Sequence, residues 1–119
     1  MSRKILVIDD SLMVRQQVTR ALTGAGFTVI GACDGVDALE KLVTNTDVKL
    51  VVCDVNMPRM SGLEFLEKVQ PGLPVVMLTT EGEPEMIARA KALGAKGWIL
   101  KPFKPELVVA TAQKLAIAA

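Results

Sequence analysis

The sequence predicts an α/β domain built on a five-stranded parallel sheet, because five short aliphatic runs alternate with five segments of helical periodicity. The aliphatic runs are continuously apolar, which is typical of strands covered on both faces. Strands that alternate with helices are joined by right-handed crossovers, so we predict a doubly wound sheet. The runs expected to form strands are residues 5–8, 28–32, 50–53, 75–78 and 98–100.

The segments between and after these runs predict the helices. In the first segment apolar residues recur three and four apart, and Gly24 and Gly26 mark its end. Pro84 and Pro105 fall in the first turn of their helices, where proline is tolerated. We therefore expect helices at residues 12–25, 34–43, 62–69, 84–93 and 105–116.

Length and composition agree with one compact unit. A chain of 119 residues can bury a core without disulfides or structural metals. Half of the residues are apolar but only 3% are aromatic, so the core must consist of aliphatic and Met side chains. We expect residues 1–119 to form a single domain with no output domain attached.

The charge balance and hydropathy argue against some partners. With 14 basic and 13 acidic residues, the chain gives no general electrostatic reason to bind nucleic acid directly. No apolar stretch approaches the roughly 20 residues that span a bilayer, and the N-terminus does not resemble a secretion signal. We expect a cytoplasmic protein without membrane insertion, in which Cys33 and Cys53 are small reduced core residues.

Polar residues follow four of the five predicted strands. In an open parallel sheet the binding crevice lies beyond the carboxyl ends of the strands, so these residues should converge. Taken alone, an acid in such a place is often a helix cap, and a lysine is often solvated. Their convergence is what indicates a site, and its members are Asp9–Asp10, Asp54, Thr79–Thr80 and Lys101–Pro102.

Three carboxylates at one place predict a bound cation, because neighbouring like charges resist joint ionisation. With the Lys101 ammonium nearby, two negative charges remain uncompensated. The ligands are all oxygen, which favours Mg²⁺ over zinc. Mg²⁺ bound by carboxylates usually leaves a coordination position for a phosphate oxygen. Lys101 and the Thr79 hydroxyl could contact other oxygens of the same phosphoryl group. Asp54 could itself be the nucleophile that forms an acyl phosphate.

These motifs resemble the bacterial two-component response-regulator receiver domain, and within that family its stand-alone chemotaxis regulators. The resemblance covers essentially the whole chain. It is carried by ILVIDDS at residues 5–11, CDVNMPRMSG at 53–62, Thr79-Thr80, and LKPF at 100–103. It implies a flavodoxin-like (βα)5 fold with strand order 2-1-3-4-5.

The resemblance also implies roles for individual residues. Asp54 would be the phosphoacceptor, and Asp10 with Asp54 would bind Mg²⁺ directly. Asp9 would contribute directly or through water, and the backbone carbonyl of Asn56 would be a further ligand. The Lys101–Pro102 peptide would be cis, which proline makes accessible.

A conformational switch is implied as well. In the family, phosphorylation draws a threonine inward and an aromatic residue follows, which here would be Thr79 and Trp98. The change alters the face formed by the fourth helix, last strand and last helix. Trp98 departs from the usual Tyr or Phe, and Thr80 stands where a small side chain is usual. Asn56, Thr80 and Glu81 would modulate the lifetime of the acyl phosphate.

The partners implied are a histidine kinase as phosphodonor and a protein target such as a flagellar motor switch protein, with the unphosphorylated domain monomeric. Like a receiver generally, the domain would catalyse its own phosphorylation and dephosphorylation without being an enzyme for other substrates. One alternative is a phosphate shuttle or sink in a relay. Another is a phosphohydrolase, which would need a second acid close to Asp54 to protonate a leaving group. No acid follows in Val55-Asn56-Met57.

Overall fold

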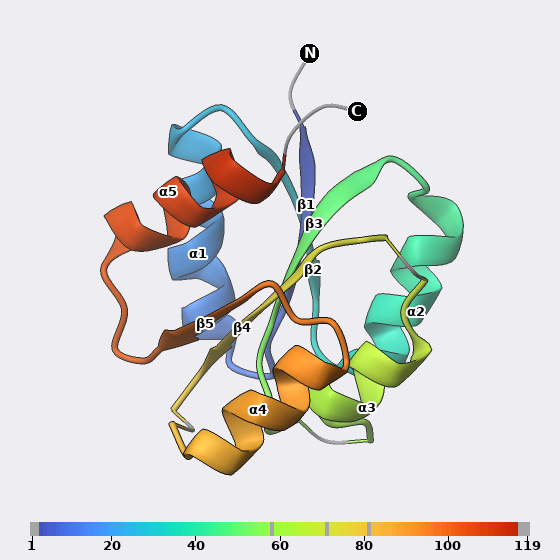
Figure 1. Ribbon diagram of the computed structural model, residues 1–119. Coiled ribbons are helices and arrows are strands. Elements are labelled where there is room, and N and C mark those ends of the chain that lie inside the picture. Colours follow the sequence, from blue (N-terminus) through green and yellow to red (C-terminus); the bar gives the residue numbers. More distant parts are fainter. Residues whose placement is uncertain (1–2, 58, 71, 81, 117–119) are drawn as a thin grey trace.

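The protein forms a five-stranded parallel sheet with the strand order β2-β1-β3-β4-β5, which confirms the predicted order (Figure 1). The computed structural model describes residues 3–57, 59–70, 72–80 and 82–116. The strands are β1 (Lys4–Ile8), β2 (Thr28–Ala32), β3 (Val48–Cys53), β4 (Val75–Thr79) and β5 (Gly97–Leu100). Strand β3 begins two residues before its predicted start, because Val48 pairs with Lys4 ahead of the apolar run, and the register with β1 shifts at Lys49, between Val48 and Leu50.

The helices lie on both faces of the sheet, as expected for a doubly wound domain. Helices α1 and α5 pack together on one face, while α2, α3 and α4 cover the other (Figure 1). The predicted helices are confirmed to within one or two residues at each end. Their bounds are α1 (Leu12–Gly24), α2 (Gly35–Thr44), α3 (Gly62–Lys68), α4 (Pro84–Ala92) and α5 (Pro105–Leu115).

Side chains at the helix starts explain where the helices begin. The Ser11 hydroxyl accepts a hydrogen bond from the Val14 backbone N–H, and the Asp34 carboxylate accepts one from Asp37. Ser61 and Glu64 form a capping box at α3. These bonds satisfy N–H groups that have no partner within the helix, so the loops after β1, β2 and β3 are closed by local capping.

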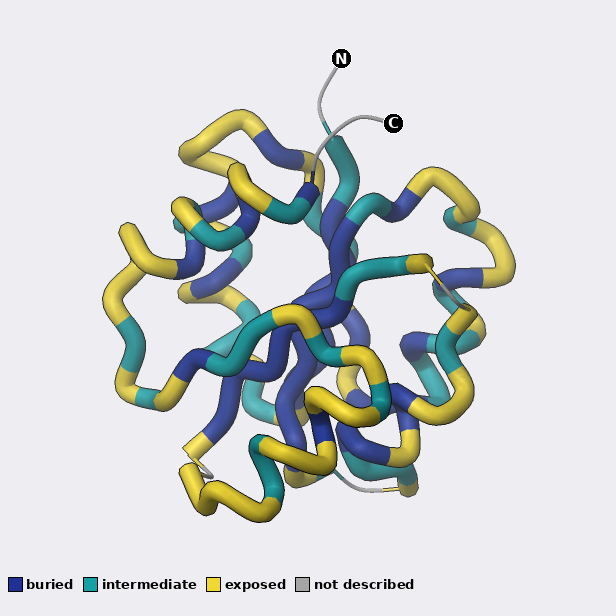
Figure 2. The backbone as a smooth tube through the Cα atoms, in the orientation of Figure 1, coloured by how far each residue is buried: buried dark blue, intermediate teal, exposed yellow. Residues whose placement is uncertain are grey.

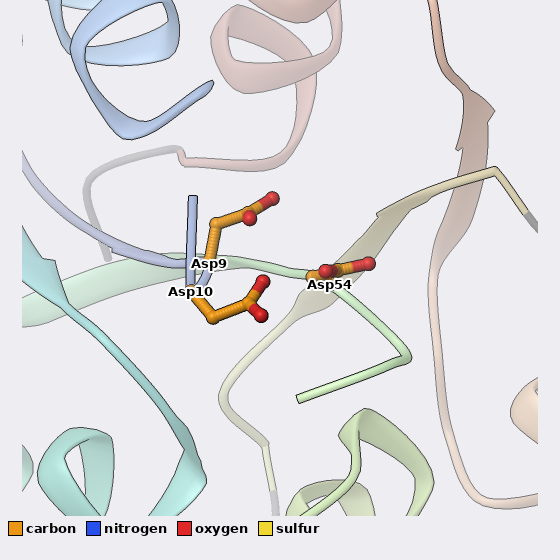
Figure 3. Close-up of side chains that lie close together, drawn as sticks. All are labelled: Asp9, Asp10 and Asp54. Carbon is orange, nitrogen blue, oxygen red and sulfur yellow. The ribbon is translucent and has the colours of Figure 1, made fainter. Parts of the chain in front are cut away.

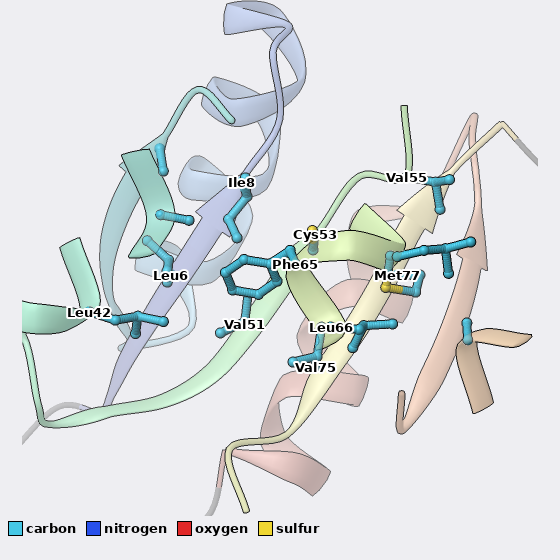
Figure 4. Close-up of a cluster of buried hydrophobic side chains, with 14 of the residues drawn as sticks. Leu6, Ile8, Leu42, Val51, Cys53, Val55, Phe65, Leu66, Val75 and Met77 are labelled. Carbon is cyan, nitrogen blue, oxygen red and sulfur yellow. The ribbon is translucent and has the colours of Figure 1, made fainter. Parts of the chain in front are cut away.

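Alternate residues of each central strand supply two separate hydrophobic clusters. From β1, Leu6 and Ile8 join the cluster under α2, α3 and α4, whereas Ile5 and Val7 join the cluster under α1 and α5. Figure 4 shows the first cluster around Phe65, which is fully buried. Because both faces are covered, the central strands are mostly dark in Figure 2, and most of their residues are apolar.

The edge strands are less buried than the central ones, and this corrects one prediction. Strand β2 carries two exposed residues among its five, and Cys33, which follows it, is also exposed. The prediction of two core cysteines is therefore wrong for Cys33 and right for Cys53, which is buried in the centre of the sheet. Within the described ranges, no helix is long and apolar enough to cross a bilayer.

Candidate functional site

The acidic side chains after β1 and β3 meet at one edge of the sheet. Ile8 pairs with Cys53 in the parallel ladder, so the residues that follow these two strands are neighbours. One carboxylate oxygen from each of Asp9, Asp10 and Asp54 lies within 4.8 Å of the others. Figure 3 shows the three side chains gathered over the ends of β1 and β3. The structure thus brings together the carboxylates that we expected to converge.

Backbone hydrogen bonds extend the sheet ladder into this cluster. The Asp9 N–H donates to the Ala32 carbonyl at 3.1 Å, and the Asp54 N–H donates to the Ile8 carbonyl at 2.9 Å. The backbone of Asp9 is therefore held by the edge strand β2, and that of Asp54 by the inner strand β1, rather than by a free loop. Asp9 and Asp54 are only 2% and 6% exposed, whereas Asp10 is exposed and forms the solvent side of the cluster.

Each buried carboxylate uses one oxygen to contact the backbone. Asp9 Oδ1 accepts a hydrogen bond from the Ser11 N–H at 2.9 Å, and Asp54 Oδ1 accepts one from the Val55 N–H at 2.8 Å. These bonds fix the orientation of the carboxyl groups. The second oxygen of each group, Oδ2, lies on the side of Lys101.

Lys101 supplies positive charge to the cluster. Its Nζ lies 2.8 Å from Asp9 Oδ2 and 3.6 Å from Asp54 Oδ2, and its side chain is 16% exposed. The Lys101–Pro102 peptide is cis, as the resemblance implied. The Lys101 N–H donates to the Thr79 carbonyl at 2.8 Å, so the end of β5 is tied to the end of β4 beside the acids.

Electrostatics at the site resist ionisation of Asp54. Burial, followed by the charge of Asp9, raises the pKa of the Asp54 carboxyl above its usual range, although Lys101 acts in the opposite direction. Burial, together with the same acids, also holds the pKa of the neighbouring Cys53 thiol well above normal. Cys53 is thus an inert core thiol, whereas Asp54 is a carboxylate that a cation would stabilise.

The three acids could hold a metal ion. Three carboxylates against one ammonium leave two uncompensated negative charges in a partly buried place. The oxygen donor set fits a hard divalent cation, and the exposed side at Asp10 leaves room for water or another ligand.

The remaining predicted site residues lie around this cluster. Thr79 is fully buried at the end of β4, whereas Thr80 and Asn56 are exposed. Trp98 is half-buried, stands opposite Met77 in the ladder and packs against the cluster under α2, α3 and α4. Glu81 lies outside the described residues. The roles given to these residues stay predictions.

The structure also shows contacts that the sequence did not indicate. The Arg15 guanidinium donates a hydrogen bond to the Asp9 carbonyl, which ties the first turn of α1 to the acidic edge. Arg59 forms a two-point ion pair with Asp34 across the loops after β3 and β2. Arg59 lies within the CDVNMPRMSG run at residues 53–62, but nothing in the sequence identifies Asp34 as its partner, and no pattern identifies the Asp9 carbonyl as the partner of Arg15.

The fold belongs to the flavodoxin-like class of doubly wound domains, with an acidic cluster at the carboxyl ends of β1 and β3. The chain matches the family described as the response regulator receiver domain over residues 5–113. It therefore belongs to the response-regulator receiver family, as the motifs indicated.

Chemotaxis proteins are among its relatives. The chain is 38% identical to the chemotaxis protein CheY1 of Helicobacter pylori over 111 residues, which cover 88% of this chain and 90% of the relative. The structure of chemotaxis protein CheY4 of Vibrio cholerae has a TM-score of 0.90 and 41% identity, and the match covers 97% of this chain and 99% of that one. A CheX–CheY–BeF3–Mg²⁺ complex from Borrelia burgdorferi has a TM-score of 0.90 at 27% identity, covering 97% and 90%.

Proposed function

We propose that this receiver domain accepts a phosphoryl group from a histidine kinase onto Asp54 in a Mg²⁺-dependent reaction, and that the modified domain binds a protein target in chemotaxis signalling. The observation that carries the proposal is the placement of Asp54. Asp54 is only 6% exposed, and one of its carboxylate oxygens lies within 4.8 Å of an oxygen of Asp9 and an oxygen of Asp10. The Nζ atom of Lys101 lies 3.6 Å from Asp54 Oδ2. The CheY relatives support the assignment to chemotaxis.

Asp54 is the nucleophile in this proposal. The Val55 N–H holds Oδ1, so Oδ2 is the oxygen that attacks phosphorus. A bond forms between this oxygen and phosphorus, and the bond from phosphorus to the donor nitrogen breaks with its electron pair leaving on nitrogen. Lys101 then contacts a phosphoryl oxygen, and the Thr79 hydroxyl donates a hydrogen bond to another.

Asp9, Asp10, Asp54 and the backbone carbonyl of Asn56 would hold the Mg²⁺. When bound, the ion neutralises the excess negative charge and supplies electrostatic stabilisation for the incoming phosphoryl oxygens. The protein fixes two of its carboxylates in advance through the Ser11 and Val55 N–H groups. Asn56 and Thr80, which are exposed, and Glu81 would modulate how readily water reaches the acyl phosphate, and hence how fast the domain dephosphorylates itself.

The output surface in this proposal is the face of α4, β5 and α5. Thr79 pairs with Leu100 at the end of β5, and the Lys101 N–H donates to the Thr79 carbonyl, so a movement of Thr79 toward a phosphoryl group acts directly on β5. Trp98 follows on the same strand. Leu100 and Leu107 are 51% and 50% exposed on this face, which gives a target apolar surface to bury.

In the cell, the domain would work in the cytoplasm, monomeric until phosphorylated, with a flagellar motor switch protein as one candidate target. The chemotaxis relative and the exposed Leu107 of α5 support a protein target in chemotaxis. Phosphorylation shifts the equilibrium toward the target-binding form only by as much as the phosphoryl group interacts better with that form.

Intact mass spectrometry after incubation with acetyl phosphate tests the proposal. We expect a mass increase of one phosphoryl group that requires Mg²⁺ and is absent in Asp54→Asn. Modification of Asp54→Asn to the same extent would place the acceptor elsewhere. No modification of the native protein under any condition would reject the phosphoacceptor role.

A further inference from the structure

We propose that the ion pair between Asp34 and Arg59 positions the segment between β3 and α3, and that Mg²⁺ affinity depends on this pair. The inference rests on the proposed metal site, because that segment carries Asn56, the proposed carbonyl ligand. Asp34 and Arg59 would then act as positioning residues that do not touch the metal themselves.

The pair has the geometry of a strong, oriented contact. Arg59 Nε lies 2.7 Å from Asp34 Oδ2, and Nη2 lies 3.0 Å from Oδ1, so both carboxylate oxygens are engaged. Asp34 is only 4% exposed and also accepts the Asp37 N–H that caps α2. A buried carboxylate needs such compensation, which makes Arg59 its counter-charge.

The backbone of Arg59 is also constrained. Its φ of 65° lies in the left-handed region, which an arginine adopts only at a conformational cost. The two hydrogen bonds to Asp34 offset that cost. Without the ion pair, the Arg59 side chain would lose its partner, and its backbone would be able to leave the unfavourable left-handed conformation.

The segment held by Arg59 begins and ends at the phosphoacceptor. It leaves the sheet at Asp54 and returns where the Gly62 N–H donates to the Val55 carbonyl at 2.7 Å. Between these points Asn56 and Arg59 are exposed. Contacts from the start of α2 hold this exposed stretch, through the N-cap Asp34 and through Gly35.

Gly35, the first residue of α2, and Met60 provide a second contact between the start of α2 and the β3–α3 segment. A Cβ atom built on Gly35 would lie 2.7 Å from the Met60 sulfur, so the methionine packs directly on the glycine backbone. The β3–α3 segment is thus fixed to the start of α2 by one polar and one apolar contact. Met57 and Met60 pack onto the hydrophobic cluster beneath.

Mg²⁺ makes the position of such a segment matter. The ion requires near-ideal octahedral geometry, so a backbone carbonyl ligand must be held in place. Residues that orient metal ligands typically change metal affinity about 10- to 100-fold when they are mutated. Loosening the β3–α3 segment would let the Asn56 carbonyl leave its position without altering any of the three carboxylates.

Isothermal titration calorimetry with MgCl₂ tests the inference on Arg59→Gly and Asp34→Asn. Glycine accepts a φ of 65° without strain, so Arg59→Gly removes the guanidinium while easing the backbone. Asparagine keeps an oxygen for the Asp37 N–H, so Asp34→Asn removes charge but retains the helix cap. We expect Mg²⁺ to bind Arg59→Gly about tenfold more weakly than the native protein, and Asp34→Asn to be intermediate.

Asp47→Asn is the matched control. It breaks the Lys4–Asp47 ion pair of 2.9 Å, at the end of β1 away from the acids, and should leave the dissociation constant unchanged. The Arg59→Gly Asp34→Asn double variant should bind no more weakly than Arg59→Gly alone, because the two residues act as one unit. Circular dichroism confirms that each variant is folded at the titration temperature.

The outcomes are distinct. Equal affinity of native protein and both single variants would overturn the positioning role while leaving the proposed function intact. Additive losses in the double variant would show that Asp34 and Arg59 act separately and would overturn the role of the pair. Absence of Mg²⁺ binding by the native protein would reject the proposed metal site itself, and with it this inference.

Discussion

The ammonium of Lys101 donates a hydrogen bond to Asp9 at 2.8 Å, across 92 positions of sequence. This contact connects the end of β5, at one edge of the sheet, to the end of β1 near its centre. The same ammonium stands 3.6 Å from Asp54. In the proposed reaction, Lys101 would exchange a carboxylate partner for a phosphoryl oxygen without a large movement.

Lys101→Ala should separate metal binding from switching. We expect Mg²⁺ to bind with little change in affinity, because the three carboxylates remain, while phosphorylation no longer alters Trp98 fluorescence. The reason is that the β5 end loses its charged contact with the phosphoryl site. Fluorescence titration with acetyl phosphate in saturating Mg²⁺ measures this, with the exposed Lys104→Ala as control. A native-like spectral change in Lys101→Ala would contradict the role of Lys101.

Asp10→Asn should remove the stabilisation that Mg²⁺ gives to the folded state. At a Mg²⁺ concentration 100-fold above the dissociation constant, the native protein should gain about 2.7 kcal/mol in its free energy of unfolding. The variant should gain less than half as much at that concentration, because one proposed ligand is missing. Urea denaturation with and without MgCl₂ measures the gain. NaCl at equal ionic strength controls for screening, and an equal gain in both proteins would exclude Asp10 as a ligand.

Stability should fall at acidic pH as Asp34 loses its charge. The Arg59 hydrogen bonds, followed by the Asp37 N–H, hold the pKa of the Asp34 carboxyl below its ordinary value. Because the pKa of Asp34 is lower in the folded state than in the unfolded state, its ionised carboxylate stabilises the fold fully above the unfolded-state pKa of about 3.8. This stabilisation is lost as the pH falls through the lower pKa of the folded state. The difference in unfolding free energy between native protein and Asp34→Asn should therefore shrink between pH 6 and about pH 3. Urea titrations across this range measure it, and a difference that grows with acidification would show the opposite shift.

Gly62→Ala should damage both folding and the site. A Cβ at this position would press on the Asp54 carbonyl oxygen and lie 2.7 Å from the Met77 methyl and 2.9 Å from the Val55 Cα. Two of these neighbours are backbone atoms that cannot rotate away. We expect a loss of about 1–3 kcal/mol in unfolding free energy, as for other overpacked positions.

Gly24→Ala is the control for that change. Among the described residues, no atom outside its chain neighbours and the nearby backbone of its own helix lies within 4 Å of a Cβ built there, and Gly24 is the last residue of α1. Alanine at this helical position should be neutral or stabilising by up to about 1 kcal/mol. Equal losses of unfolding free energy in Gly62→Ala and Gly24→Ala would show that crowding around Asp54 is not the reason that position 62 requires glycine.

The sheet and the acidic edge were predictable because they depend on local patterns. Residues after the apolar runs must collect at one end of a parallel sheet, and this rule alone brings Asp9, Asp10, Asp54 and Lys101 together. The residues that fix the loops were not predictable in this way. Arg59 and Asp34 lie 25 positions apart in two loops, where neither helical nor strand periodicity operates. Their pairing depends on how two turns pack, which emerges only in three dimensions.

Cys33 shows a second limit of sequence patterns. It follows an apolar run, as Cys53 does, yet one is exposed and the other buried. The difference lies in strand position, because β2 is an edge strand and β3 is central. The apolar run itself does not distinguish an edge from a centre.

The ladder bonds that continue past β1 and β3 bear on the dynamics of the site. The amide of Asp54 donates to Ile8 of the inner strand β1, and the amide of Asp9 donates to Ala32 of the edge strand β2. An amide bonded between inner strands exchanges with solvent deuterium only when those strands separate, so the Asp54 amide should exchange slowly. Chemical turnover at Asp54 would thus take place on one of the most protected stretches of backbone, and the faster fluctuations that admit donors and water would belong to the loops around it.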